Sequence, residues 1–134
     1  MYFIFKYFDV QKADIVIHNE QELHTAFQEL MKNLVPESIN LISSNSDIFT
    51  IAMGAEFGFI QFESSSPQSP YLIAVDTTRR EQRNQFREVD AGGTPTPIPE
   101  YACLSPEQVT KIVICYFQNG EIPKHLTSIE WEDA

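Results

Sequence analysis

Three short apolar runs in the middle of the chain, separated by links of only a few residues, constrain the fold more than any other feature. The runs cover residues 39–42, 48–53 and 57–62, and the links between them are rich in Ser, Asn and Gly. Links this short join antiparallel neighbours, because parallel strands need a crossover of a dozen or more residues. The pattern therefore predicts an antiparallel meander, and the apolar run at 71–75 predicts a further, central strand.

The first residues predict a β-hairpin ahead of this meander. Residues 1–9 and 14–18 are rich in aromatic and β-branched side chains, and the residues between them are polar enough to turn. At the other end, residues 126–133 predict a short extended segment that packs Ile129 and Trp131 inward. The chain therefore contains about six strands in addition to this tail.

Residues 19–34 have the three- and four-residue spacing of an amphipathic helix. Asn19 is a favoured N-cap, Glu22 stands where its side chain can complete a capping box, and Pro36 lies just past the end. The apolar face consists of Leu23, Phe27, Leu30, Met31 and Leu34. This stretch predicts a helix with one buried side.

A second helix is predicted to begin after Ser105. Ser105 suits the N-cap, Pro106 suits the first helical position, and Gln108 can close a capping box. Gly120 is a natural C-terminal stop, which Pro123 reinforces. The apolar face consists of Val109, Ile112, Val113, Tyr116 and Phe117.

Together these elements predict a single α+β domain over residues 1–134. The length of 134 residues and the hydrophobic content of 43% suit one ordinary core. An antiparallel sheet of about six strands, with both amphipathic helices packed on one face, buries the two apolar helix faces in the simplest way. Residues 77–99 are polar and predict a long irregular loop, with a short strand at most around Phe86 and Val89.

The charge balance is strongly acidic. The chain has 19 Asp and Glu against 9 Lys and Arg, a formal net charge of −10. Contact with phosphates needs a basic surface, so this balance argues against nucleic-acid binding and, for the same reason, against anionic membranes. It predicts either a basic protein partner or an acidity that serves solubility alone.

The N-terminal residues lack a basic leader, an uninterrupted apolar segment and a small-residue cleavage site. No window approaches the ~18 apolar residues of a membrane-spanning helix. We therefore expect a cytoplasmic protein, in which Cys103 and Cys115 are free thiols.

The common catalytic and nucleotide-binding motifs do not occur in the sequence. The spacing of Cys103, Cys115 and His125 matches no common zinc site. Glu130 and Glu132 lie on one face of an extended tail, where such acids are usually solvated rather than catalytic. We predict no catalytic residues, no metal and no cofactor, and a protein that acts by binding another protein.

The final third of the chain carries a more specific pattern. It reads Leu104-Ser105-Pro106-Glu107-Gln108 at the helix start, Tyr116-Phe117 near the helix end, Gly120, Pro123, and then Ile129-Glu130-Trp131-Glu132. This pattern, with the Gly-rich segment that ends at Gly92-Gly93, resembles the bacterial immunity proteins of the Imm1 family, which occur in polymorphic toxin systems. Six of these residues are expected to be structural: Ser105, Pro106, Tyr116, Phe117, Gly120 and Trp131.

The resemblance implies a cognate toxin, in this family frequently a zinc-dependent nucleic-acid deaminase, held inactive in a one-to-one complex. The family offers no catalytic residues to transfer, and its motif does not define the interface. From the charge and the length of the 77–99 loop we predict that this loop enters a basic face of the toxin. The acids expected to contribute are Asp76, Glu88, Asp90, Glu100, Glu130 and Glu132.

Three alternatives remain open from the sequence. One is a 77–99 loop that only closes the sheet, and Trp131 is either a core residue or an interface anchor. A small acidic adaptor that binds a secretion or regulatory partner would have the same surface and the same missing motifs. A small hydrolase that uses Cys103 or Cys115 would require a thiol with a lowered pKa.

Overall fold

The structure, a computed structural model, describes residues 1–82, 84–91 and 94–134. Its helices and strands are β1 (Phe3–Tyr7), β2 (Ile15–Ile17), α1 (Glu20–Leu30), β3 (Glu37–Ser43), β4 (Ile48–Met53), β5 (Gly58–Glu63), β6 (Leu72–Asp76), β7 (Phe86–Ala91), β8 (Thr94–Pro99), α2 (Pro106–Asn119) and β9 (Ile129–Asp133). Two 3-10 helices, Thr77–Gln82 and Glu100–Ala102, flank the β7–β8 pair.

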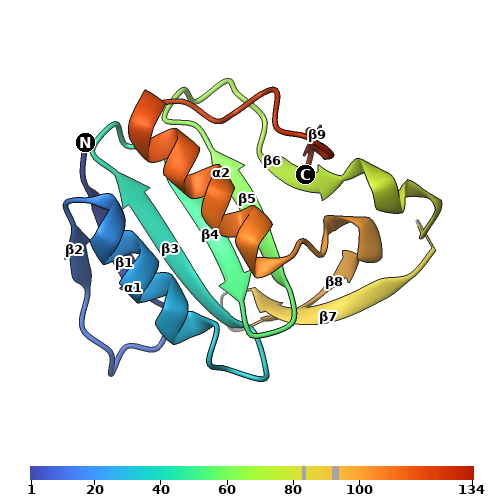
Figure 1. Cartoon of the computed structure of the whole chain (residues 1–134), viewed down its shortest axis with the longest axis horizontal. Coiled ribbons are helices and arrows are strands. Elements are labelled where there is room, and N and C mark those ends of the chain that lie inside the picture. The colour runs from blue at the N-terminus through green and yellow to red at the C-terminus, as the bar shows by residue number, and fades with distance from the viewer. Residues whose placement is uncertain (83, 92–93) are drawn as a thin grey trace.

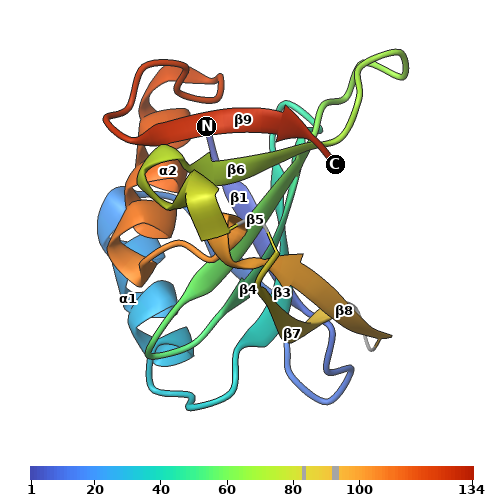
Figure 2. The same ribbon diagram turned by 90° about the vertical axis from the view of Figure 1, so that its right-hand side faces the viewer.

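Seven strands form one sheet in the order β2-β1-β3-β4-β5-β6-β9, and each neighbouring pair is antiparallel. Both helices cover one face of this sheet, which we call the helical face, and the β7–β8 hairpin lies on the opposite, second face (Figures 1 and 2). The predicted α+β class, the meander and the placement of both helices on one face are confirmed. The strand count is higher than predicted, because β9 pairs with β6 and completes the sheet.

The core on the helical face is centred on aromatic side chains. Phe49 is fully buried, and its ring centroid lies 5.0 Å from that of Tyr116 and 5.1 Å from that of Phe62. The Tyr116 hydroxyl donates to Asp47 Oδ2 at 2.6 Å and lies 2.9 Å from Ser43 Oγ. Burial and the bond to Asp47 raise the pKa of Tyr116 to about 12. This contact fastens α2 to the β3–β4 turn.

Helix α1 starts as predicted but ends four residues early. Asn19 accepts a bond from the Glu22 amide, whereas the Glu22 carboxylate accepts from the His18 amide instead of closing a box on Asn19. Leu34, predicted on the buried face, is 85% exposed, so that part of the prediction is wrong. The chain turns at Met31, and the Asn33 carbonyl then accepts from the Ala55 amide at 2.8 Å. This tertiary bond draws the segment away from the helix axis.

Helix α2 matches its prediction at both ends. Ser105 and Gln108 form both bonds of the capping box, at 3.1 and 2.8 Å, and Gly120 ends the helix with φ at 76°. A positive φ of this size favours glycine because it has no Cβ. Tyr116 on the apolar face is fully buried and Phe117 is half-buried. No helix in the described part of the chain is long and apolar enough to cross a membrane.

Trp131 is half-buried and packs against the core on the helical face. Strand β9 places it opposite Ala74 of β6, and its ring centroid lies 6.2 Å from that of Phe62. Its indole Nε1 donates to the Pro123 carbonyl at 2.9 Å, so the polar end of the side chain is also satisfied. Of the two readings of this tryptophan, the structure supports the structural one.

The segment 77–99 is not the irregular loop that we predicted. It contains a 3-10 helix and the antiparallel β7–β8 hairpin, in which Val89 and Ile98 are buried. These two side chains form a second apolar cluster with Ala52, Phe59 and Val75 of the sheet. Burial of a Val or Ile side chain contributes about 1.5–3 kcal/mol, which is the reason that this polar segment folds back on the sheet. Gly92 and Gly93, part of the family resemblance, lie outside the described residues.

Prolines at every second position of β8 explain why this segment was predicted to be a loop. They are Pro95, Pro97 and Pro99. The Glu100 amide donates to the Gln85 carbonyl at 2.7 Å, so in the β7–β8 ladder the prolines occupy the positions that face away from β7. A proline there costs no ladder bond and leaves few donors on the outer edge of the hairpin, which discourages pairing with another strand.

Candidate protein-binding face

The second face of the sheet is covered by the chain over only part of its area. Strand register brings four aliphatic side chains into one row across β2, β1, β3 and β4, since residues directly opposite each other share a face. This aliphatic row consists of Val16, Ile4, Ile42 and Ile48. Val16 is 47% exposed, and the three isoleucines are half-buried.

A row of polar side chains separates the aliphatic row from the hairpin. It consists of Lys6, Asn40, Thr50 and Gln61. The Thr50 hydroxyl donates to Asn40 Oδ1 at 3.0 Å, and Lys6 Nζ lies 3.7 Å from an oxygen of Asp14. We call the two rows together the open face. In Figure 2 the helices lie on the left of the sheet and the hairpin projects on the right, the side of the open face.

Acids border the open face on the strands that follow. Glu63 stands opposite Ile48 and accepts from the Tyr71 hydroxyl at 3.0 Å. Further along, Glu132 is opposite Ile73 and Glu130 is opposite Val75, so these two acids of β9 point to the second face. Apolar side chains with carboxylates at their border form a surface suited to a partner with basic groups around an apolar centre.

Arg80 brings Glu130 and Glu132 together. It projects from the first 3-10 helix, and its Nη2 contacts Glu130 Oε2 and lies 3.3 Å from Glu132 Oε1. The Glu130 side chain is 58% exposed, and that of Glu132 is 34% exposed. These two predicted contact acids are therefore adjacent and accessible, and one arginine balances part of their charge.

Glu100 is held by Arg87 of the hairpin. Arg87 Nε donates to both carboxylate oxygens, at 2.9 and 3.1 Å, and the guanidinium lies 4.9 Å from the centre of the Phe57 ring. The Glu100 side chain is only 15% exposed. This geometry indicates that Glu100 anchors the base of the hairpin.

Asp76 is buried at the start of the 3-10 helix, with 6% of its surface exposed. Its carboxylate accepts from the amide and hydroxyl of Thr78, at 3.0 and 2.6 Å, and from Gln108 Nε2 at 3.3 Å. Burial by itself would raise the pKa of Asp76, but these bonds and the nearby charge of Arg79 outweigh it, and the pKa is lowered. The position of Asp76 favours a structural role over direct contact with a partner.

Replacing Asp76 with asparagine is expected to lower the free energy of unfolding by about 1–3 kcal/mol at neutral pH, because the amide leaves buried donors without an acceptor. The folded-state pKa is lowered, so the stabilisation is present above the unfolded pKa of about 3.9 and is lost as the pH falls through the folded pKa. Urea denaturation at neutral pH and at about pH 3 checks this. An equal difference between wild type and variant at both pH values would contradict it.

The outer side of the hairpin carries Phe86 and Glu88. They alternate with the inward residues Arg87 and Val89, and Phe86 is 59% exposed. Glu88 is exposed and makes no ion pair among the described residues. The side chain of Asp90, the remaining predicted acid, lies outside the described part of the structure. Among the predicted acids whose side chains the structure describes, Glu88, Glu130 and Glu132 present accessible carboxylates.

Sequence reasoning did not identify the aliphatic row or Phe86 as surface residues. Ile4 and Ile42 lie in runs that are apolar on both faces, so alternation does not indicate which side of the strand is uncovered. The cover on the second face comes from the β7–β8 hairpin, which begins more than 40 residues after Ile42 and more than 80 after Ile4. The only local signal was Val16, which lies in a short strand and would mark a sheet edge.

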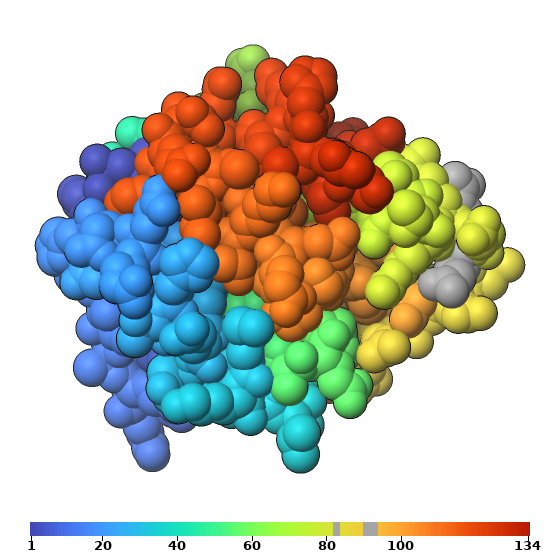
Figure 3. Space-filling view, viewed as in Figure 1, coloured from blue at the N-terminus to red at the C-terminus, as the bar shows by residue number. Residues whose placement is uncertain are grey.

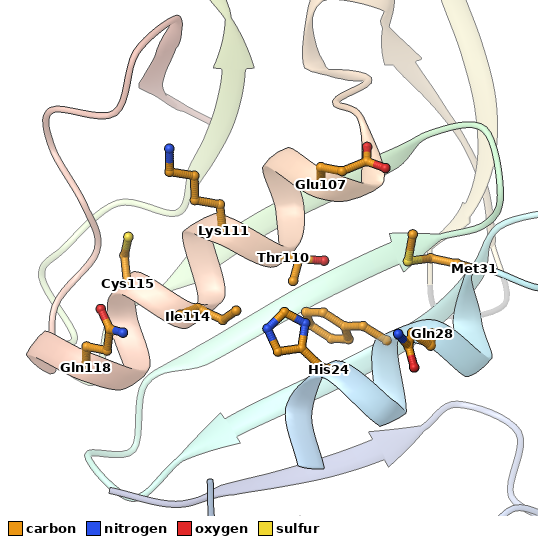
Figure 4. A pocket seen from close by; sticks show the side chains of 10 residues that line it. His24, Gln28, Met31, Glu107, Thr110, Lys111, Ile114, Cys115 and Gln118 are labelled. Atoms are coloured by element: carbon orange, nitrogen blue, oxygen red, sulfur yellow. The ribbon is translucent and has the colours of Figure 1, made fainter. Parts of the chain in front are cut away.

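A groove of about 490 Å³ runs between α1 and α2 on the helical face (Figures 3 and 4). His24 of α1 and Met31, which follows the end of α1, project into it, Thr110 and Ile114 face it from α2, and Lys111 points away. At one end Gln118 Nε2 donates to Glu20 Oε1 at 2.7 Å. The groove is mainly apolar and contains no converging set of ionised groups that would fix a small ligand.

The two cysteines do not form a reactive pair. Cys103 is fully buried, and burial raises the pKa of its thiol to about 11, the opposite of what a nucleophilic cysteine requires. Cys115 is half-buried at the edge of the helical groove. Among the described residues, no group of three or more His, Cys, Asp and Glu side chains could hold a metal ion.

Comparison with known proteins connects this geometry to a family. Residues 11–133 match the family model described as immunity protein Imm1. The match therefore extends from the first hairpin to β9, well beyond the C-terminal pattern noticed in the sequence. A search of curated proteins finds no match to the chain.

Proposed function

Because the chain belongs to the Imm1 family of immunity proteins, we propose that it neutralises its toxin by covering the surface through which the toxin reaches its substrate. The protein acts in the cytoplasm as a stoichiometric binder and needs no catalytic residue, metal or cofactor. The observation that carries the proposal is the second face, where the uncovered open face, the projecting hairpin and accessible acids lie on the same side of the sheet.

The proposed toxin is a nucleic-acid deaminase. Such an enzyme takes its target base into a pocket beside a groove that follows the phosphates, so its substrate surface is basic. A protein with a net charge of −10 is complementary to that surface. Occupying the groove would exclude nucleic acid even if the zinc centre were not touched.

The accessible acids Glu88, Glu130 and Glu132 provide the charge in this proposal, and Asp90 remains a sequence-based candidate beside them. Charge complementarity mainly raises the association rate, while a few buried side chains slow dissociation. Asp76 and Glu100 contribute indirectly, because they hold the 3-10 helix and the base of the hairpin in place.

Co-expression with the reading frame immediately upstream of this gene tests the proposal. We expect that the upstream product alone arrests growth, that co-expression of this chain restores growth, and that the two proteins co-purify in a one-to-one complex. Growth arrest that persists despite soluble, folded protein, with no complex in the pull-down, would contradict the proposal and favour the adaptor alternative. Expression of this chain alone is the control for its effect on growth.

A further inference from the structure

We infer that the aliphatic row of Val16, Ile4, Ile42 and Ile48 is the centre of the toxin interface, where the toxin places an apolar patch surrounded by basic side chains. This inference rests on the proposed function and specifies where that binding occurs. It moves the centre of the contact away from the 77–99 segment, which then borders the interface.

The geometry of the row supports this assignment. Neighbouring strands lie about 4.8 Å apart, so four side chains across four strands extend over about 14 Å. Single exposed aliphatic residues are common on protein surfaces, but four in adjacent register form a continuous apolar strip. An antiparallel sheet face left to solvent ordinarily carries polar side chains, as the neighbouring polar row does.

On the covered part of the second face, apolar side chains of the sheet are packed under the hairpin. There Ala52, Phe59 and Val75 pack under Val89 and Ile98 of the hairpin. In the described part of the chain, this cluster includes no member of the aliphatic row. The chain therefore supplies a cover for one apolar strip of the second face and leaves the other available.

The charged side chains around the aliphatic row indicate which kind of partner binds there. Lys6, the one lysine in the polar row, is paired with Asp14, whereas Glu63 at the end of the aliphatic row has no ion pair among the described residues. The acids Glu130 and Glu132 lie on the same face. A second copy of the chain would bring together two molecules with a charge of −10 each, so a basic partner is favoured over a dimer.

The test removes apolar character from the row while keeping β-branched side chains. Val16→Thr and Ile42→Thr, singly and combined, keep β-branched residues suited to strands. Val35→Thr is the matched control, because Val35 is 76% exposed in the link between α1 and β3, outside the open face. Surface plasmon resonance against the toxin domain encoded upstream measures the rates, and thermal unfolding confirms that each variant is folded.

We expect the double variant to dissociate at least about tenfold faster, since apolar centres of interfaces govern dissociation, and the control to behave as wild type. Wild-type dissociation rates for the folded row variants would overturn the inference while leaving the proposed function intact. Failure of the wild-type protein to bind would refute the function itself. A wild-type dimer in sedimentation that the row substitutions dissociate would assign the row to a second copy and also overturn the inference.

Discussion

Replacing Phe49 with alanine is expected to lower the free energy of unfolding by about 4 kcal/mol. Phe49 is fully buried, and its ring contacts the rings of Phe3, Phe62 and Tyr116, from two other strands and from α2. The substitution removes the buried ring and leaves a cavity that rigid strands cannot close. Urea denaturation followed by fluorescence or circular dichroism measures the loss.

Phe86→Ala provides the matched control for this substitution. It deletes the same atoms from a side chain that is 59% exposed on the outer side of the hairpin. Surface substitutions usually change stability by less than about 0.5 kcal/mol, and we expect a change of that size here. A loss below about 1.5 kcal/mol for Phe49→Ala, or equal losses for the two variants, would contradict the core described above.

Removing negative charge from the second face is expected to slow toxin association by about tenfold or more at low salt. The variant combines Glu88→Lys with Glu130→Gln and Glu132→Gln. Glutamine is used in β9 because lysine at those positions would place cations against Arg80. The proposed basic toxin surface would lose its long-range attraction, so the association rate should also become less dependent on salt concentration. Stopped-flow association at several ionic strengths measures both effects.

A variant with the same change in net charge on the helical face distinguishes the effect of where the charge lies from the effect of total charge. Glu107→Lys with Glu20→Gln and Glu29→Gln removes the same amount of charge from α1 and α2. If the second face is the interface, this control should slow association much less. Equal slowing by the two variants would show that only net charge matters, and unchanged rates for both would remove the electrostatic part of the proposal.

The contacts of the segment 77–99 also explain how it can serve in binding without being a free loop. Each of three arginines from the region 77–99 contacts an acid of the fold: Arg79 with Asp76, Arg80 with Glu130 and Glu132, and Arg87 with Glu100. These contacts hold the first 3-10 helix against β6 and β9, and the base of the hairpin at Glu100, before a partner arrives. A surface organised in advance loses less conformational entropy on binding than a mobile loop would.

Local sequence was sufficient for the start of both helices, for the end of α2 and for the antiparallel meander. Asn19, Ser105 and Gly120 act through bonds within a few residues of the chain, so their roles could be predicted from spacing alone. The short links of the meander likewise define antiparallel neighbours without reference to the rest of the molecule. The C-terminal pattern around Trp131 indicated the family, which the match over residues 11–133 confirms.

The tertiary structure decided which surfaces remain available for binding. Arg80 and Glu130 are 50 residues apart, and the residues that cover Phe59 follow it by 30 positions or more, so no local pattern reports either contact. The local sequence around Ile42 does not indicate whether its side of the sheet is covered by another segment or exposed. Caps and turns depend on hydrogen bonds between near neighbours, whereas the exposure of a sheet face depends on which distant segment packs against it, and only the folded chain determines that.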